Sequence, residues 1–368
     1  MAIISGFKYT IREKMYSLQG HIHIELYNPN RSQSLTLAPV KWDPVLVNRL
    51  QHTEHVQDIS VFAARPTIIQ SKGQMEGVLL KGVNKDYHYS KDISFSGEPI
   101  DYSDTAYSKQ IILSQNTADK LNLAIGDTVQ LYFLEQGVKF PRIRKVRVAG
   151  FFHTGMGEMD NYFGLGDIRL IQRVNNWQPN EISGYQLQLD NEKYADTVAN
   201  LIFDKYLQAP MTSYTMKDIY SSVFDWLDLQ DVNGRIILLI MSVVAIINLA
   251  TALVILIVEQ SRMVGLLKAL GMGLRKMRRI FLYHAAIIAG MGIVLGNMLA
   301  LGLCWLQLKT GFLKLSEETY YMKQVPVRIN WWQVTAVDAG TLILCLLCMW
   351  LPTLYIRRVR PAQVLQFK

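Results

Sequence analysis

The chain has 368 residues, 50% of them hydrophobic, and a formal net charge of +8. This length exceeds one typical domain, and the apolar share is enough for a soluble core as well as membrane helices. Much of the cationic excess borders long apolar runs, at residues 259–279 and 357–368, so the basic character does not require a nucleic-acid partner.

The first predicted element is an amphipathic helix over residues 1–20. Ile4, Phe7, Ile11, Met15 and Leu18 recur at three- and four-residue spacing, which places them on one helical face. Such a face is typical of a helix that rises from a bilayer surface.

Residues 21–213 alternate between strand and helix patterns, which predicts an α+β domain with a mixed sheet. Residues 21–26 read His-Ile-His-Ile-Glu-Leu, the strict alternation of a strand. His21 and His23 could hold a metal ion, but the sequence places no third ligand nearby. We therefore expect His21, His23 and Glu25 to form the solvated face of this strand.

A glycine-rich loop, read from VAGFFHTGMGEMDNYF, follows a later strand of this domain. His153, Glu158 and Asp160 could form a metal or acid–base site. One histidine and two carboxylates among glycines are more typical of a hydrogen-bonded turn. No Ser/His/Asp or Cys/His set is evident in the sequence, so we predict no catalytic residue, no metal and no cofactor.

Three long apolar stretches occupy the second part of the chain. Residues 236–258 and 280–308 carry no Asp, Glu, Lys or Arg, and residues 331–356 form a third stretch. Each exceeds the roughly 20 residues that a membrane-spanning helix needs. We predict that residues 214–235 form a stiff lever helix before the first span, 309–330 an external loop and 357–368 a cytoplasmic tail.

Polar and small residues inside these spans are expected to serve packing. Gly292, Gly296 and Ala300 lie four residues apart, a spacing that allows close helix contact in lipid. Asp338 lies about two turns into the third span, and Asn248 is expected to bond a neighbouring helix. The three cysteines, Cys304, Cys345 and Cys348, also lie inside the spans, where packing is favoured over redox or zinc chemistry.

The segment between the first two spans, residues 259–279, is strongly basic. It carries six cations against the single acid Glu259, which predicts a cytoplasmic location. Leucines at three- and four-residue spacing predict a short amphipathic helix that Gly271 and Gly273 terminate. Such a helix could lie on anionic lipid headgroups. The particular residues of this segment favour a more specific role.

The sequence of this basic segment resembles the cytoplasmic segment of the FtsX-like permease family. The glycine-rich loop described above resembles that of the lipoprotein-releasing, LolC/LolE-type branch of the family. The resemblance implies that the segment couples the membrane helices to a partner ATPase. The implied ATPase-coupling residues are Glu259, Arg262, Met263, Gly265, Leu266, Leu267, Lys268, Leu270 and Gly271. The external family motif is carried by Gly150, Phe152, Gly155, Glu158 and Asp160.

The resemblance also implies a type of external domain, a cellular location and partner proteins for this chain. It implies a MacB-like periplasmic core domain, a separate LolD-like ABC ATPase and a second permease copy or paralogue in the bacterial inner membrane. The cargo would be a lipoprotein passed to a periplasmic carrier, although the loop at 134–144 that would meet the carrier is short here. Because no signal precedes the external domain, we expect a fourth transmembrane helix before residue 1 in the full-length protein.

Two further interpretations stay open. The chain could be an efflux permease or an FtsX-type activator of a cell-wall hydrolase, both within the same superfamily. It could instead be a membrane-anchored binding or sensor protein that works without an ATPase. The sequence has no Gly-x-x-x-x-Gly-Lys-Ser/Thr phosphate loop, so the chain is not expected to hydrolyse ATP itself.

Overall fold

A computed structural model describes residues 2–29, 37–87, 93–134, 140–260, 263, 266–267, 270–315, 322 and 324–355. The chain divides into two compact units. The sheet domain comprises Tyr9–Asp225 and Leu315–Lys323, and the helical unit comprises Met1–Lys8, Trp226–Lys314 and Gln324–Lys368.

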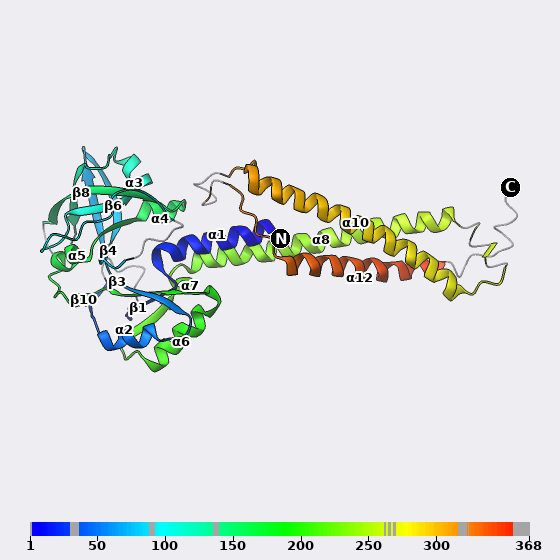
Figure 1. The fold of residues 1–368 in the computed structure, drawn as a ribbon, viewed down its shortest axis with the longest axis horizontal. Helices are drawn as coiled ribbons and strands as arrows, with labels where there is room; N and C mark the ends of the chain where they lie inside the picture. Colours follow the sequence, from blue (N-terminus) through cyan, green and yellow to red (C-terminus); the bar gives the residue numbers. More distant parts are fainter. Residues whose placement is uncertain are drawn as a thin grey trace. The chain divides into compact units, whose positions relative to one another are not determined.

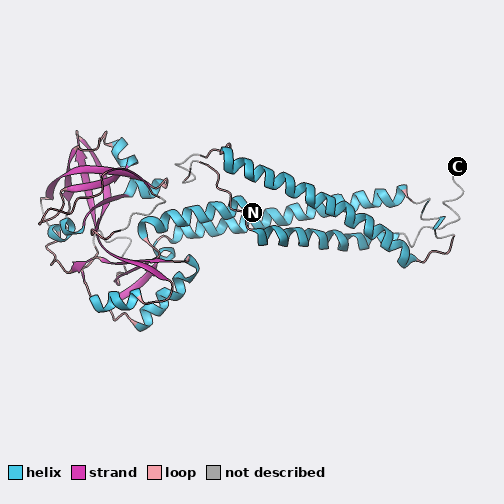
Figure 2. Ribbon diagram, in the orientation of Figure 1, coloured by secondary structure: helices cyan, strands magenta, loops and turns pink. Residues whose placement is uncertain are grey.

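The sheet domain is built on a ten-stranded mixed sheet, drawn in magenta in Figure 2. Its order is β12-β1-β11-β3-β4-β9-β6-β8-β5, and β7 pairs with β3 and β8. The pairs β4–β9 and β6–β8 are parallel, so the predicted mixed α+β sheet is confirmed. The strands are β1 (Ile22–Leu26), β3 (Val56–Ser71), β4 (Gln74–Val83), β5 (Ser94–Gly97), β6 (Gln110–Ser114), β7 (Thr128–Phe133), β8 (Arg142–His153), β9 (Phe163–Asp167), β11 (Gly184–Leu189) and β12 (Met211–Thr215), and β2 (Val40–Lys41) pairs separately with β10 (Glu181–Ile182).

The sheet domain has two halves, and the long strand β3 runs from one to the other (Figure 1). Each half has its own group of helices. The helices α2 (Pro44–Gln51) and α6 (Ala195–Lys205) pack near β3 and β12, and α3 (Gln115–Lys120), α4 (Gly157–Tyr162) and α5 (Ile168–Val174) pack on the other half. The first turns of α2, α3 and α5 are capped by the side chains of Asp43, Ser114 and Asp167. Each of these side chains accepts a hydrogen bond from a backbone N–H of the first turn. Buried aliphatic side chains from both halves form one continuous core.

The strand β1 is confirmed, but the prediction that its polar face is solvated is wrong. His21, His23 and Glu25 are all at most 5% exposed. The strand lies between β11 and β12, and its polar face lies beneath the end of α1 (Ala2–Gln19). The alternation in the sequence therefore separates an apolar buried face from a polar buried face, which a two-residue period cannot distinguish from exposure.

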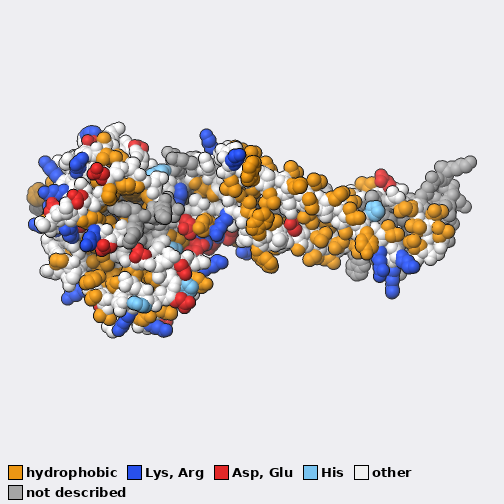
Figure 3. All heavy atoms as spheres, in the orientation of Figure 1, with side chains coloured by type: hydrophobic (Ala, Val, Ile, Leu, Met, Phe, Trp, Pro, Cys, Tyr) orange, Lys and Arg blue, Asp and Glu red, His pale blue; other side chains and the backbone are white. Residues whose placement is uncertain are grey.

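Within its described residues, the helical unit contains the long helices α8 (Ser221–Glu259), α10 (Leu274–Thr310) and α12 (Trp331–Tyr355). Two stretches of the described residues, Ser221–Ala252 and Leu282–Thr310, are long and apolar enough to cross a bilayer. Trp331–Leu347 is a shorter apolar stretch, so the third span stays a prediction. Figure 3 shows apolar side chains over these helices, as expected of surfaces that face lipid.

The predicted lever helix over residues 214–235 begins later than expected. Tyr214 and Thr215 belong to β12, the short helix α7 covers Met216–Ile219, and α8 begins at Ser221. Thr215 and Asp218 form a capping box, each side chain accepting the backbone N–H of the other. From Ser221 onward the helix is continuous through the predicted first span.

The small-residue stripe on α10 is not covered by the part of the chain that the structure describes. Among the described residues, no atom lies within 4 Å of a Cβ built at Gly292 or Gly296. Helix packing through Gly292, Gly296 and Ala300 therefore stays a prediction. Within the unit, α10 contacts α12 through a hydrogen bond of 2.7 Å from Asn297 Nδ2 to Asp338 Oδ2.

The first turns of α1 pack tightly in the helical unit. Lys8 pairs with Asp228 and Asp231 on α8, and the ring of Phe7 meets Trp226 edge-on at 5.6 Å. The Arg328 N–H donates to the Ala2 carbonyl at 3.1 Å. A Cβ at Gly6 would lie 2.6 Å from the Pro326 carbonyl oxygen, so only glycine fits against this backbone.

We expect Gly6→Ala to separate the start of α1 from the segment around residue 326. The added methyl group overpacks the contact by about 1–3 kcal/mol, which corresponds to about fivefold to a hundredfold faster hydrogen exchange at the Arg328 amide. Exchange measured by mass spectrometry on the full chain tests this. Gly290→Ala is the matched control, because no described atom lies within 4 Å of its Cβ, and equal exchange in the two variants would contradict the packing argument.

Candidate functional site

The basic segment between α8 and α10 ends as its glycines predict. The Met272 N–H donates to the Leu267 carbonyl at 3.0 Å, and Gly271 has a φ of +83°. This is the Schellman arrangement, in which a glycine in the left-handed region closes a helical turn. The predicted site residues Arg262, Gly265 and Lys268 lie outside the described residues, whereas Glu259, Met263, Leu266, Leu267, Leu270 and Gly271 are described.

Charges around this segment oppose the helix dipoles. Glu259 is the last residue of α8, where a negative charge meets the negative end of the helix. Arg275 and Lys276 lie in the first turn of α10, whose N-cap Gly273 offers no capping side chain. Each such placement costs about 0.3–1 kcal/mol, so helix stability does not explain these charges. The group of cations at this end of the helical unit is visible in Figure 3.

The segment presents apolar side chains outward. Leu270 is 77% exposed and Leu266 53% exposed. A hollow of about 580 Å³ lies at the bend, with apolar walls and a basic rim, and it is lined by Leu267, Leu270, Gly271, Met272, Gly273, Arg275 and Lys276. An exposed leucine face beside a hollow is typical of a surface that receives another protein.

The glycine-rich loop of the sheet domain is a hydrogen-bonded turn, as predicted. Asp160 on α4 is 1% exposed. Its carboxylate accepts the Thr154 N–H at 2.9 Å, the Thr154 hydroxyl at 2.8 Å and the Gly155 N–H at 3.1 Å. His153 Nδ1 lies 2.9 Å from the same carboxylate. All of these contacts fix the loop, so Asp160 has the geometry of a structural hub and not of an acid–base group.

Gly150 and Phe152 of this motif also serve the fold. Phe152 is buried, and a Cβ at Gly150 would lie 2.6 Å from the Ser96 carbonyl oxygen, so glycine allows β5 to approach β8. Glu158 lies in α4, and its side chain is outside what the structure describes.

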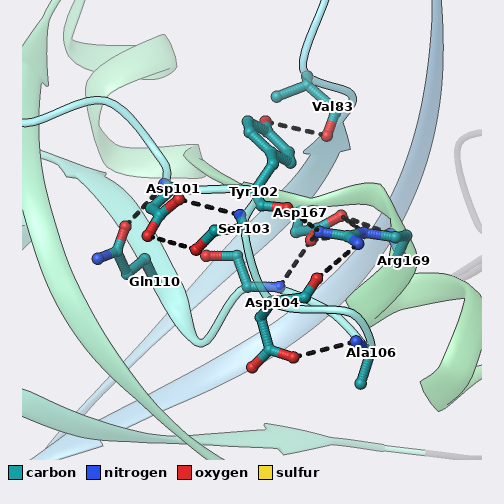
Figure 4. A network of polar contacts seen from close by, with 10 residues as sticks. Val83, Asp101, Tyr102, Ser103, Asp104, Ala106, Gln110, Asp167 and Arg169 are labelled. Atoms are coloured by element: carbon teal, nitrogen blue, oxygen red, sulfur yellow. Dashed lines mark hydrogen bonds and ion pairs between the residues drawn. The ribbon is translucent and has the colours of Figure 1, made fainter.

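A cleft of about 870 Å³ separates the two halves of the sheet domain, with walls from α2, the first half of β3 and α5. The Arg169 guanidinium on its wall contacts the buried Asp167 carboxylate at 2.7 Å (Figure 4). It also donates to the Asp104 carbonyl at 2.8 Å and reaches the Tyr102 carbonyl at 3.4 Å. The Arg169 guanidinium therefore neutralises Asp167 and holds the 101–106 loop in place.

Sequence reasoning missed a buried polar group beneath α1. Lys81 on β4 is 2% exposed, and burial lowers its pKa to about 7. His21 stacks on Tyr16 with ring centroids 4.1 Å apart, and its Nδ1 accepts the Leu189 N–H at 3.1 Å. Burial lowers the pKa of His21 to about 4, against weaker raising contributions from Gln188 and Asp190. No local sequence pattern marks these residues, because strands far apart in the chain bring them together.

The buried His21 makes the sheet domain sensitive to acid. Below pH 6.5 the unfolded chain binds a proton at His21 that the folded chain does not bind until about pH 4. Stability conferred by the neutral ring is therefore present above pH 6.5 and falls by about 1.4 kcal/mol per pH unit, roughly 3 kcal/mol in all, as pH drops to 4.

Urea unfolding of the purified chain at a series of pH values, followed by tryptophan fluorescence, checks this expectation. His21→Asn keeps a hydrogen-bond acceptor but does not titrate, so the stability of the wild type relative to this variant should fall by roughly 3 kcal/mol as pH drops from 6.5 to 4. A constant difference from pH 7 to pH 4 would contradict the role of His21.

Comparison with known families matches both parts of the chain. Residues 1–202, more than half of the chain, match the model described as MacB-like periplasmic core domain. Residues 235–361 match the model described as FtsX-like permease C-terminal.

Curated relatives match over almost the whole length. The chain is 24% identical to the lipoprotein-releasing system transmembrane protein LolE of Haemophilus influenzae, over 99% of this chain and 89% of that protein. It is 22% identical to LolC of Neisseria meningitidis serogroup B, over 100% of this chain and 90% of that protein.

Among solved structures, the periplasmic region of MacB from Actinobacillus actinomycetemcomitans matches with a TM-score of 0.38. It is 13% identical and covers 55% of this chain and 91% of that chain. The extracellular domain of the ABC-type transporter YknZ matches with a TM-score of 0.36 at 15% identity, over 53% of this chain and 99% of that chain.

Proposed function

Because this chain belongs to the permease family that joins a MacB-like periplasmic core domain to an FtsX-like permease C-terminal region, we propose that it transmits force from a separate ATPase to the sheet domain. It is a permease subunit of an ABC transporter. We place the sheet domain in the periplasm and the helical unit in the bacterial inner membrane. Its cargo is a lipoprotein, which it extracts from the membrane and releases to a periplasmic carrier.

The geometry of residues 259–279 carries this proposal. The exposed leucines Leu266 and Leu270, the Schellman turn at Gly271 and the basic first turn of α10 form one surface at the end of two apolar helices. Charges that oppose their own helix dipoles favour a partner that compensates them. An ATPase groove with an apolar floor and an acidic rim has the complementary chemistry.

Lipoprotein release is favoured by similarity over nearly the full length of proteins named for that activity. We propose a LolD-like ATPase dimer and two permease subunits, the second being a copy or a paralogue. The open small-residue stripe at Gly292 and Gly296 suits the contact with another helix. No cofactor or metal belongs to this subunit in the proposal, and ATP binds to the partner.

Reconstitution tests the proposed activity. The complex is purified through a tag on this chain, placed in liposomes with a triacylated lipoprotein, and supplied with ATP and a soluble carrier. We expect ATP-dependent transfer of the lipoprotein to the carrier. Purification without any nucleotide-binding subunit would instead favour the sensor interpretation, and ATP hydrolysis without lipoprotein transfer would remove the cargo assignment.

A second candidate, the efflux permease, is favoured by one observation. β7 ends at Phe133 and β8 begins at Arg142, so the connection that would meet a carrier is short. Residues 135–139 of it lie outside the described residues, and Leu134 and Phe140 beside them are exposed. Phe140→Asp is expected to lower transfer to the carrier if that connection binds it. Unchanged transfer in this variant would favour efflux or another route of release.

A further inference from the structure

The C-terminal end of α1 is held by side chains from strands β1 and β4 and from the segment that follows β4. A helix leaves its last four carbonyl groups without partners inside the helix. Here the Leu18 carbonyl accepts Lys81 Nζ at 2.7 Å and the Tyr87 hydroxyl at 3.3 Å. The next carbonyl, of Gln19, lies 2.7 Å from His23 Nε2. Lys81, Tyr87 and His23 thus form a socket around the helix end, and we call these three residues the α1 socket.

Lys81 is the unusual member of the α1 socket. Among the described residues, no carboxylate lies within ion-pair distance of its ammonium group. Its other contacts are the Gln19 and Gln186 side-chain carbonyls and the rings of Phe62 and Tyr87, at 5.5 Å and 5.8 Å from Nζ. Burying a cation without an anion is costly, and the negative end of a helix is the main charge that compensates Lys81 here.

The backbone at the end of α1 leaves no freedom to shift. Gly20 has a φ of +70°, and its N–H donates to the Tyr16 carbonyl at 2.8 Å. A Cβ there would lie 2.8 Å from the Leu187 carbonyl oxygen, and the His21 N–H bonds that same oxygen at 2.8 Å. The helix end is therefore fixed both by its own backbone and by Lys81 from β4.

We propose that Lys81 is a positioning residue that anchors α1 to the sheet, so that displacement of α1 during the ATPase cycle moves β4 and its hairpin partner β3. This inference rests on the proposed transmission of force, and it names the point where force enters the sheet domain. β4 pairs with β3 from Val83 to Gln74, so a pull on Lys81 acts on the longest strand pair of the domain. A lysine amine aligned with a helix end suits this load, because it donates the hydrogen bond to the Leu18 carbonyl in either protonation state, and that bond is charge-assisted when the amine is protonated.

Hydrogen exchange of the full chain, purified with its ATPase, tests the anchor. Exchange is compared between the nucleotide-free complex and the complex trapped with ATP and vanadate. In the wild type we expect nucleotide-dependent differences both in α1 and in the β3–β4 hairpin. In Lys81→Met we expect the amides of residues 16–20 to exchange about tenfold faster, equivalent to about 1.4 kcal/mol, and the nucleotide-dependent difference in β3–β4 to disappear.

Two further variants separate an anchor from a purely structural lysine. Lys85→Met removes an exposed lysine four residues away and should leave both differences as in the wild type. Lys81→Arg retains a cation and its donors and should restore the nucleotide-dependent difference in β3–β4. A purely structural role predicts loss of protection throughout the sheet domain in Lys81→Met, and that result would overturn the proposal.

The remaining outcomes of this experiment also decide whether Lys81 anchors α1 to the sheet. Unchanged exchange at residues 16–20 in Lys81→Met, or a β3–β4 difference that survives in it, would overturn the anchor. So would a wild-type complex without any nucleotide-dependent change in the sheet domain. Failure of lipoprotein transfer in the liposome assay, with these exchange differences intact, would remove only the proposed cargo.

Discussion

Leu270→Glu is expected to abolish the stimulation of ATP hydrolysis that this chain confers on its ATPase. Leu270 is 77% exposed, so the substitution leaves the packing of the chain intact. At a protein interface the new carboxylate would be buried beside apolar groups without a partner. Truncating or charging a central apolar contact commonly costs 2 kcal/mol or more, so we expect roughly a thirtyfold or greater loss.

The measurement is ATP hydrolysis by the complex in lipid nanodiscs, with and without this chain. Met75→Glu is the matched control, because Met75 is a similarly exposed apolar residue on the sheet domain. Leu267→Glu and Gly271→Arg should behave like Leu270→Glu, since a side chain at Gly271 is strained by about 1–2 kcal/mol at a φ of +83°. Unaltered stimulation in all three variants, with normal membrane insertion, would refute the coupling role of the segment.

Asp160→Ala is expected to cause the largest loss of stability in the sheet domain. The substitution leaves the Thr154 N–H, the Thr154 hydroxyl and the Gly155 N–H without their acceptor in a buried loop. Removing one partner of a buried charged network costs about 3–5 kcal/mol. We therefore expect the domain to unfold at markedly lower urea concentration.

Urea unfolding of the purified chain, followed by limited proteolysis and by tryptophan fluorescence, measures this loss. Asp119→Ala is the control, because Asp119 is exposed and its carboxylate accepts a hydrogen bond from the Gln115 side-chain amide at 2.8 Å. A change within about 0.5 kcal/mol is expected there. If the two variants unfolded at the same urea concentration, Asp160 would not be the hub of the loop.

Features encoded by local spacing could be predicted from the sequence. The basic leucine-faced segment is one example, since charge, three- and four-residue spacing and Gly271 are all local signals. The turn around Asp160 is another, because Thr154, Gly155 and Asp160 lie within seven consecutive positions of one loop. Hydropathy likewise located the apolar runs that became α8 and α10.

Features that depend on tertiary contact could not be predicted in this way. His21, His23 and Glu25 alternate as a half-exposed strand does, and only the placement of β1 inside the sheet shows that both faces are buried. Lys81 lies on a different strand, β4, so no motif links it to the end of α1.

One error had an available local signal. The sequence Thr-Met-Lys-Asp at residues 215–218 is a capping-box pattern, and it marks the start of a helix at Met216. The predicted start at residue 214 lies instead within β12, and the long helix α8 begins only at Ser221, after the short helix α7.

The central claim is that residues 259–279 face the cytoplasm and receive motion from an ATPase. Cysteine labelling tests it most directly, using Arg275→Cys in a chain whose Cys304, Cys345 and Cys348 are replaced by serine or alanine. A membrane-impermeant maleimide should label residue 275 only after the inner membrane is opened, whereas Asp86→Cys in the sheet domain should be labelled as soon as the outer membrane is permeable. Labelling of residue 275 together with residue 86, before the inner membrane is opened, would contradict the account.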